Sequence, residues 1–154
     1  MNYFEIFDLK INTQIDLDQL EEKYLTFQQQ FHPDKASTAD IEKSILLNEA
    51  FEVLKTTFSR LSYILKLQGT DILDDTKAPK VDNETLQEIW ELQEELLESS
   101  QDEKIKLKKE LKNKVSNLLT QSAEEINNKN FTKAAQILIR SKYFNKILQS
   151  LKSV

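Results

Sequence analysis

Apolar residues between Ile15 and Phe31 recur at alternating spacings of three and four, which is the period of one stripe along a helix. The positions on this stripe are Leu17, Leu20, Tyr24, Phe27 and Phe31. Asp16 is a candidate N-cap for the helix. Pro33 must end it near Phe31, because proline lacks a backbone N–H and disfavours α geometry in the residue before it. The pattern predicts a first long helix over residues 16–31.

A second long helix is predicted after the polar cluster from Ser37 to Asp40. Its apolar positions are Ile41, Ile45, Leu47, Ala50, Leu54 and Phe58. We expect this face to lie against the first helix, so that the two form an antiparallel hairpin. Residues 3–9 would cover the hairpin as a short leading segment. Residues 58–68 would continue as helix or restart near Thr56 and Thr57.

The rest of the chain predicts a three-helix bundle. Gly69 and Pro79 bracket the one stretch without helical periodicity, which we interpret as a linker. Three further helices are predicted over residues 83–99, 102–126 and 131–152. The middle one carries a stripe of Leu111, Val115, Leu118, Ser122 and Ile126, and the last one carries Ala134, Ile137, Phe144, Leu148 and Leu151. The expected fold class is all-α, with units over 1–68 and 82–154 joined by a linker at 69–81.

Composition supports helices and narrows the chemistry. The chain has 154 residues, 39% of them hydrophobic and 31% charged, with one Gly and two Pro, which suits packed helices better than a sheet with many tight turns. Zero Cys and a single His leave no thiolate or His-rich ligand set, so no metal or other cofactor is expected. The net charge of −5 favours protein partners over nucleic acid or an anionic membrane.

Targeting signals do not stand out in the sequence. No apolar run approaches the roughly 20 residues that span a bilayer, and the first residues, MNYFEIFDL, have no basic region before an apolar stretch. We therefore expect a cytoplasmic protein.

The only His and one of the two Pro are neighbours at the tip of the predicted hairpin, in the segment FHPDK at 31–35. Recognition residues are common at such tips. Pro33 stiffens the loop, His32 offers an imidazole, and Asp34 can pair with an arginine of a partner. The alternative is that the tripeptide only stops the helix, with Asp34 or Ser37 capping the next one.

Residues 1–68 resemble a J-domain, with a short first helix, FHPDK between two long helices, and NEAFEVL in the second. The resemblance is closer to the HscB-type iron–sulfur co-chaperones. It rests on MNYFEIF at the start, RLSYILKLQG at 60–69 and ELQEEL at 91–96, and covers nearly the whole chain. It implies that His32, Pro33, Asp34 and Lys35 dock on a heat-shock-class ATPase chaperone (HscA-like) and stimulate its ATP hydrolysis.

Two departures from the family pattern bear on docking. J-domains usually carry a basic face on the helix before HPD, whereas residues 16–31 hold four carboxylates against Lys23 alone. This favours a dedicated chaperone partner over promiscuous docking. Thr57 stands where the family often has a proline after the second long helix, so that the bend there is softer.

The first bundle helix offers a second candidate site. On a helical wheel, Ile89, Leu92 and Leu96 form one apolar stripe, and Leu86, Trp90 and Leu97 form another about a quarter-turn away. The first stripe can fill the core. The second, edged by Gln87, Glu91 and Glu94, is a candidate partner surface, because interface hot spots combine an apolar anchor with a polar rim. The alternative is that Trp90 packs on a neighbouring helix or on the J-domain.

The family resemblance assigns this second surface to binding of an iron–sulfur scaffold protein (IscU-like). The positions that match are Leu86, Gln87, Trp90, Glu91, Glu94 and, from the last helix, Tyr143. Gln87 replaces a usual apolar residue. The interleaved lysines at 104–114 are interpreted as a solvated helix face.

The resulting prediction is an adaptor, not an enzyme, which delivers the scaffold protein to the chaperone during iron–sulfur cluster assembly or transfer. A J-domain co-chaperone for a different client and a plain helical scaffolding protein are the alternatives. An enzyme using His32 and Asp34 as an acid–base pair is disfavoured, since no nucleophile, metal set or phosphate loop accompanies them.

Overall fold

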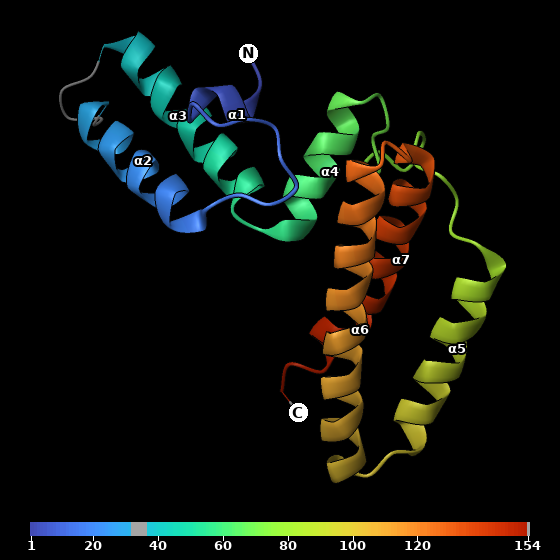
Figure 1. Cartoon of the computed structure of the whole chain (residues 1–154). Coiled ribbons are helices and arrows are strands. Elements are labelled where there is room, and N and C mark those ends of the chain that lie inside the picture. The colour runs from blue at the N-terminus through green and yellow to red at the C-terminus, as the bar shows by residue number, and fades with distance from the viewer. Residues whose placement is uncertain (32–36, 154) are drawn as a thin grey trace. The chain divides into compact units, whose positions relative to one another are not determined.

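A computed structural model describes residues 1–31 and 37–153 of the chain, and every regular element within those residues is a helix (Figure 1). The elements are α1 (Tyr3–Ile6), α2 (Leu17–Gln30), α3 (Thr38–Leu54), α4 (Thr57–Leu67), α5 (Asn83–Glu98), α6 (Gln101–Asn127) and α7 (Phe131–Ser150). The predicted all-α fold class is confirmed. The chain packs as two compact units, Met1–Ile64 and Leu65–Val154.

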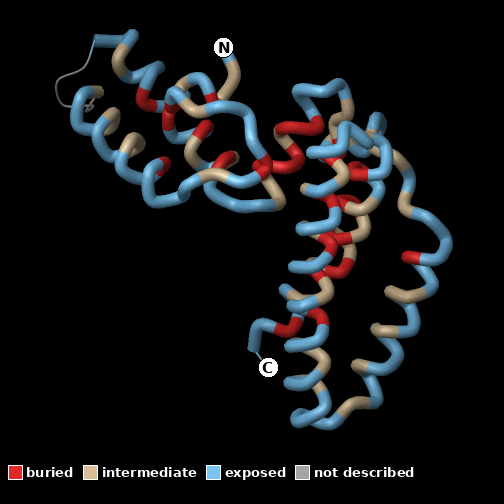
Figure 2. The backbone as a smooth tube through the Cα atoms, in the orientation of Figure 1, coloured by how far each residue is buried: buried red, intermediate tan, exposed pale blue. Residues whose placement is uncertain are grey.

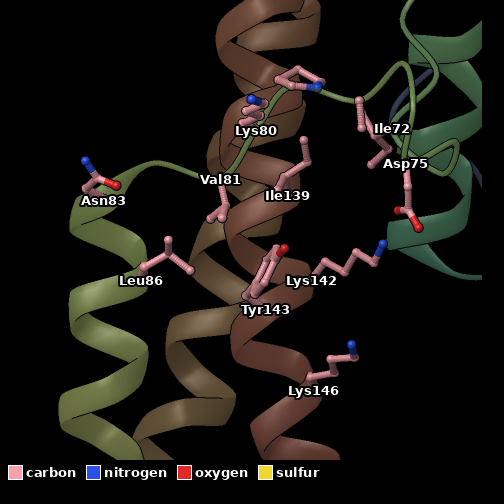
Figure 3. A pocket seen from close by; sticks show the side chains of 12 residues that line it. Ile72, Asp75, Lys80, Val81, Asn83, Leu86, Ile139, Lys142, Tyr143 and Lys146 are labelled. Carbon is pink, nitrogen blue, oxygen red and sulfur yellow. The ribbon is translucent and has the colours of Figure 1, made fainter.

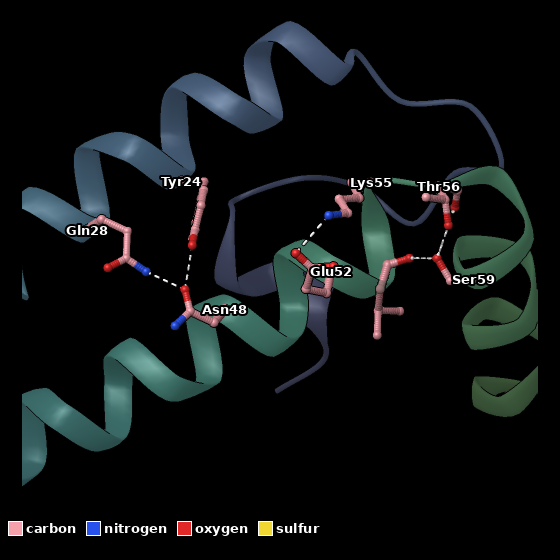
Figure 4. Close-up of polar contacts among 8 residues, drawn as sticks. Tyr24, Gln28, Asn48, Glu52, Lys55, Thr56 and Ser59 are labelled. Carbon is pink, nitrogen blue, oxygen red and sulfur yellow. Dashed lines mark hydrogen bonds and ion pairs between the residues drawn. The ribbon is translucent and has the colours of Figure 1, made fainter.

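In the first unit, α2 and α3 lie side by side as an antiparallel hairpin (Figure 1). The rings of Tyr24 and Phe51 stack with their centroids 4.1 Å apart. The Tyr24 hydroxyl and the Gln28 amide both donate to Oδ1 of Asn48, at 2.5 and 2.6 Å (Figure 4). Aromatic stacking and a shared polar acceptor therefore join the two helices.

The predicted N-cap of α2 is confirmed, whereas α3 begins at Thr38, within the polar cluster after which it was predicted to begin. Asp16 accepts a hydrogen bond from the backbone N–H of Gln19 at the start of α2, and Ser37 caps α3 through the N–H of Asp40. α2 ends at Gln30, next to Phe31. Each side chain satisfies an N–H that has no partner within the helix.

The face that α3 turns inward agrees with the prediction in the second half of the helix but not in the first half. Ile41 and Ile45 are exposed, whereas the buried positions of the helix are Ser44, Leu47, Ala50 and Leu54. The three consecutive apolar residues at 45–47 make the helical phase ambiguous in the sequence. The polar contacts of Asn48 and Ser44 with α2 then fix the phase, and a hydrophobic pattern cannot register such contacts.

Two cations hold loops of the first unit. The buried Arg60 on α4 donates from Nε to the carbonyl of Thr13 at 2.9 Å and from Nη1 to the carbonyl of Leu54 at 2.8 Å. Lys23 on α2 donates from Nζ to the carbonyl of Phe7 at 2.8 Å. The lone lysine of the first long helix is thus engaged within the fold.

The second unit is built on α6 and α7. Leu111, Val115, Leu118, Ser122 and Ile126 are all buried, as the stripe predicted (Figure 2). Phe144, Ile147 and Leu151 of the last helical segment complete the core, and Ile89, Leu92 and Leu96 of α5 pack against it. The three-helix bundle is confirmed, with helix ends within two residues of those predicted.

Gly69, near the start of the segment between α4 and α5, has a φ of +93°. Its N–H bonds to the carbonyl of Lys66, and the N–H of Thr70 bonds to that of Leu65, a pattern that ends helices with a left-handed glycine. Ile72 is then buried within the second unit. Among the helices described, none has the length and apolar character needed to cross a membrane.

Candidate functional site

The N-terminal half of α5 is fastened to α7 by polar contacts. Asp82 caps α5 by accepting from the N–H of Thr85 at 2.7 Å. Thr85 is the buried residue of α5, and its hydroxyl accepts from Nη1 of Arg140 at 2.9 Å. Arg140 uses Nη2 to reach Glu88 at 2.6 Å. One guanidinium therefore holds two successive turns of α5.

Glu88 also receives Nζ of Lys114 from α6 at 3.0 Å, so its carboxylate joins all three bundle helices. The hydrogen bond from Arg140 is the main cause that lowers the pKa of Glu88, and Lys114 adds to it. Hydrogen bonds from Thr85 lower the pKa of Asp82. Both carboxyl groups are therefore ionised at neutral pH, and they fix which side of α5 faces the bundle.

The two predicted apolar stripes of α5 separate as expected. Ile89, Leu92 and Leu96 pack against the core of the bundle. On the other stripe, the exposed fraction is 45% for Leu86, 56% for Trp90 and 86% for Leu97. Trp90 does not fill the bundle core. An exposed apolar stripe on an anchored helix is a surface suited to a partner.

The other predicted scaffold-binding residues lie around this stripe. Gln87, Glu91 and Glu94 are exposed on α5, and the Gln87 amide donates to the Glu91 carboxylate at 2.9 Å. Tyr143 on α7 is half-buried and lines the same cleft as Leu86, where the two side chains face a common space (Figure 3). We call the six residues the α5 surface, namely Leu86, Gln87, Trp90, Glu91, Glu94 and Tyr143.

All the charged side chains of α5 are negative. The helix holds six glutamates, at 84, 88, 91, 94, 95 and 98, and no lysine or arginine. Glu88 is neutralised by Arg140 and Lys114, whereas Glu91 and Glu94 stay on the exposed side. The α5 surface therefore combines apolar anchors with a negative rim.

The predicted chaperone-binding residues His32, Pro33, Asp34 and Lys35 lie outside the described residues, and their role stays a prediction. Within residues 1–31 and 37–153, no group of three or more His, Asp or Glu side chains is placed to hold a metal ion.

The sequence analysis did not predict two features of the second unit. One is the anchoring of α5 by Arg140. The signal that could have found it is the scarcity of arginine, because the chain has only two, at 60 and 140. In the structure, each of them donates to two acceptors. The other is a group of lysines around the cleft beside Leu86, at 80, 142 and 146. These come from segments some 60 residues apart, and no local pattern links them.

A helical hairpin followed by a helical bundle is the fold of J-domain-type co-chaperones. Three solved structures share this fold over 99% of the chain. They are human co-chaperone HscB (TM-score 0.89, 27% identity, 81% of that chain covered), chaperone HscB from Vibrio cholerae (0.85, 24%, 96%) and the Jac1 co-chaperone from Saccharomyces cerevisiae (0.86, 24%, 93%).

Sequence comparisons identify the family within this class of proteins. Residues 81–152 match the family described as the HSCB C-terminal oligomerisation domain. Co-chaperone protein HscB homologs from Acinetobacter baumannii (strain SDF) and Acinetobacter baylyi are 32% and 33% identical over 154 aligned residues, which cover 98% of this chain and 88% and 89% of theirs. The chain belongs to the HscB family of co-chaperones, which the sequence resemblance connects with iron–sulfur cluster biogenesis.

Proposed function

We propose that the protein brings an iron–sulfur cluster scaffold protein to a heat-shock-class ATPase chaperone and stimulates the ATPase of that chaperone. The proposal divides the chain into a J-domain (1–68), a linker (69–81) and a scaffold-binding bundle (82–154). It places the protein in the cytoplasm. Membership of the HscB family supports the co-chaperone role.

The observation that carries the scaffold-binding half is the exposure of Trp90 and Leu86 on a helix whose opposite side is fixed by Arg140. A rigid helix that offers a large aromatic anchor loses little entropy on binding. Glu91 and Glu94 select a partner with a basic rim around an apolar patch.

For the chaperone-binding half, we propose that His32, Pro33, Asp34 and Lys35 dock on the chaperone. The charges on α2 limit which chaperone surfaces can dock beside this helix. Its only lysine, Lys23, is bound to the Phe7 carbonyl, whereas Asp18, Glu21 and Glu22 are exposed. A partner that docks beside α2 therefore meets carboxylates, which favours a chaperone with a matching surface.

The hydrolytic chemistry belongs to the chaperone. The protein is proposed to act by proximity, because a scaffold held on one unit and a chaperone held on the other meet at a high effective concentration. The proposal requires no catalytic residue and no cofactor in this chain.

Two single substitutions test the halves separately. Trp90→Ala should weaken scaffold binding by about 30-fold or more, the range of a hot-spot residue, and leave basal ATPase stimulation intact. Ile105→Ala removes a comparably exposed apolar side chain from α6 and should leave binding unchanged. His32→Gln should abolish stimulation and retain scaffold binding.

Each outcome separates the alternatives. Scaffold binding that survives Trp90→Ala, with a lowered melting temperature, would favour a J-domain co-chaperone for a different client. Stimulation by the His32→Gln variant at the wild-type level would remove the J-domain role and favour a plain scaffolding protein.

A further inference from the structure

A cleft of about 680 Å³ opens beside the α5 surface, between the segment that precedes α5 and the last helix, α7 (Figure 3). Its floor includes the buried Ile139 and the half-buried Tyr143, and Leu86 lines its α5 side. Lys80, Lys142 and Lys146 surround it. We call this feature the lysine cleft. Leu86 and Tyr143 belong both to the lysine cleft and to the α5 surface, so the two features are continuous.

The ammonium groups of the three lysines are available to bind an anionic ligand. Within the described part of the chain, none of the three side-chain ammonium groups takes part in a hydrogen bond or an ion pair. Asp75 is the one acidic residue on the lining, so that the cleft has an excess of positive charge. This excess stands out in a chain with a net charge of −5, next to a helix with six glutamates and no cation.

The lining favours a segment of protein over a simpler anion. A free phosphate would use the ammonium groups and leave the apolar floor uncovered, whereas a peptide with carboxylate side chains can cover both. The glutamates of α5 would repel an extended nucleic acid backbone laid across the two features. An acidic peptide segment matches the charge and the apolar floor together.

We infer that the lysine cleft binds an acidic segment of the same scaffold protein that the α5 surface holds. The inference rests on the proposed function, because Leu86 and Tyr143 join the two sites. The combined site is negative along α5 and positive at the cleft. A partner with one basic and one acidic region can satisfy both charges in a single orientation only, so the cleft sets the register of the bound scaffold.

Charge reversal tests the inference. The double substitution Lys142→Glu with Lys146→Glu should weaken scaffold binding about tenfold at low salt, chiefly through slower association, and by less at high salt, where screening removes the attraction. Lys106→Glu with Lys109→Glu on exposed positions of α6 makes the same change of net charge and should leave the affinity near wild type. Lys146→Glu alone, at an exposed position, guards against a folding defect from placing a carboxylate at 142 near Asp75.

Cross-linking identifies the occupant. A carbodiimide couples a lysine amine directly to a carboxylate that it touches, so the complex should give links from Lys80, Lys142 or Lys146 to aspartates or glutamates of the scaffold. The matched lysines at 106 and 109 should give none.

The failure of this inference can be told from the failure of the proposed function. If Trp90→Ala abolishes scaffold binding but the reversal at 142 and 146 matches the α6 control, the scaffold role stands and the lysine cleft has no part in it. If the reversal spares scaffold binding but abolishes binding to vesicles of anionic phospholipid, the cleft serves a membrane and the inference is wrong. If Trp90→Ala and the reversal both leave scaffold binding unchanged, the scaffold binds elsewhere on the chain, and the roles of the α5 surface and of the lysine cleft are both wrong.

Discussion

Arg140 on α7 and Glu88 on α5 lie 2.6 Å apart, from Nη2 to the carboxylate, at positions 52 residues apart in the sequence. Both side chains are about three-quarters covered. The same guanidinium reaches the buried hydroxyl of Thr85. This pairing holds the helix that carries Trp90 in one rotation about its axis.

Removing the charge of Glu88 should loosen α5. Glu88→Gln weakens the charge-assisted bonds to Arg140 and Lys114, and we expect a loss of about 1–2 kcal/mol in the free energy of unfolding. Urea denaturation of the full chain measures it. Glu98→Gln, at an exposed position of the same helix, is the matched control and should change little. Equal stabilities of the two variants would mean that the ion pair does not anchor α5.

The stability contributed by Glu88 should depend on pH in one direction. Its pKa in the folded protein is lowered by the bond from Arg140, whereas in the unfolded chain the carboxyl group keeps its ordinary pKa. A carboxyl group with a lowered folded pKa adds stability above its unfolded pKa and loses it as the pH falls through the folded pKa. The gap in unfolding free energy between wild type and Glu88→Gln should therefore be constant near neutral pH and close below about pH 4.

Comparison with Glu88→Gln isolates this carboxyl, since the other acidic groups are shared by both proteins. A gap that stayed constant into strong acid would show that the loss comes from packing and not from ionisation.

Arg60 should be the costliest polar side chain of the first unit to remove. It is buried, burial lowers the pKa of its guanidinium, and it bonds the carbonyls of Thr13 and Leu54. Arg60→Met keeps most of the length and leaves two carbonyl bonds unmade, for an expected loss of about 2–4 kcal/mol. Lys66→Met, at an exposed position of the same helix, serves as the control in thermal and urea unfolding. A loss below that of the control would contradict the assignment.

The hydrophobic pattern predicted the buried face of a helix well where only one face of that helix is apolar. On α6 the five predicted positions are the five that are buried, because mostly polar residues separate them and leave a single apolar phase. On α3 the run at 45–47 permits more than one phase, and Ile45 proved to be exposed. Periodicity identifies a face only where polar residues exclude its neighbours.

The candidate site could be predicted only in part for a related reason. The second stripe, with Leu86 and Trp90, follows from the wheel of α5 alone, and the structure adds that it is exposed. The anchoring of α5 and the lysine cleft depend on which segments meet in space, and residues 80, 85, 140 and 146 share no local pattern. Tyr143 was placed by family resemblance and not by periodicity.

Asn48 on α3 should couple energetically to Tyr24 on α2, because its Oδ1 accepts from the Tyr24 hydroxyl and from Gln28 (Figure 4). Asn48→Ala alone would mislead, since alanine favours a helix and offsets part of the lost bonding. A double-mutant cycle with Tyr24→Phe removes that effect and should give a coupling of about 0.5–1.5 kcal/mol in unfolding free energy. ATPase stimulation by the double variant should match wild type at low temperature and fall only as the hairpin melts, unlike that of His32→Gln. A coupling near zero would mean that the ring stacking of Tyr24 on Phe51 joins the helices without help from Asn48.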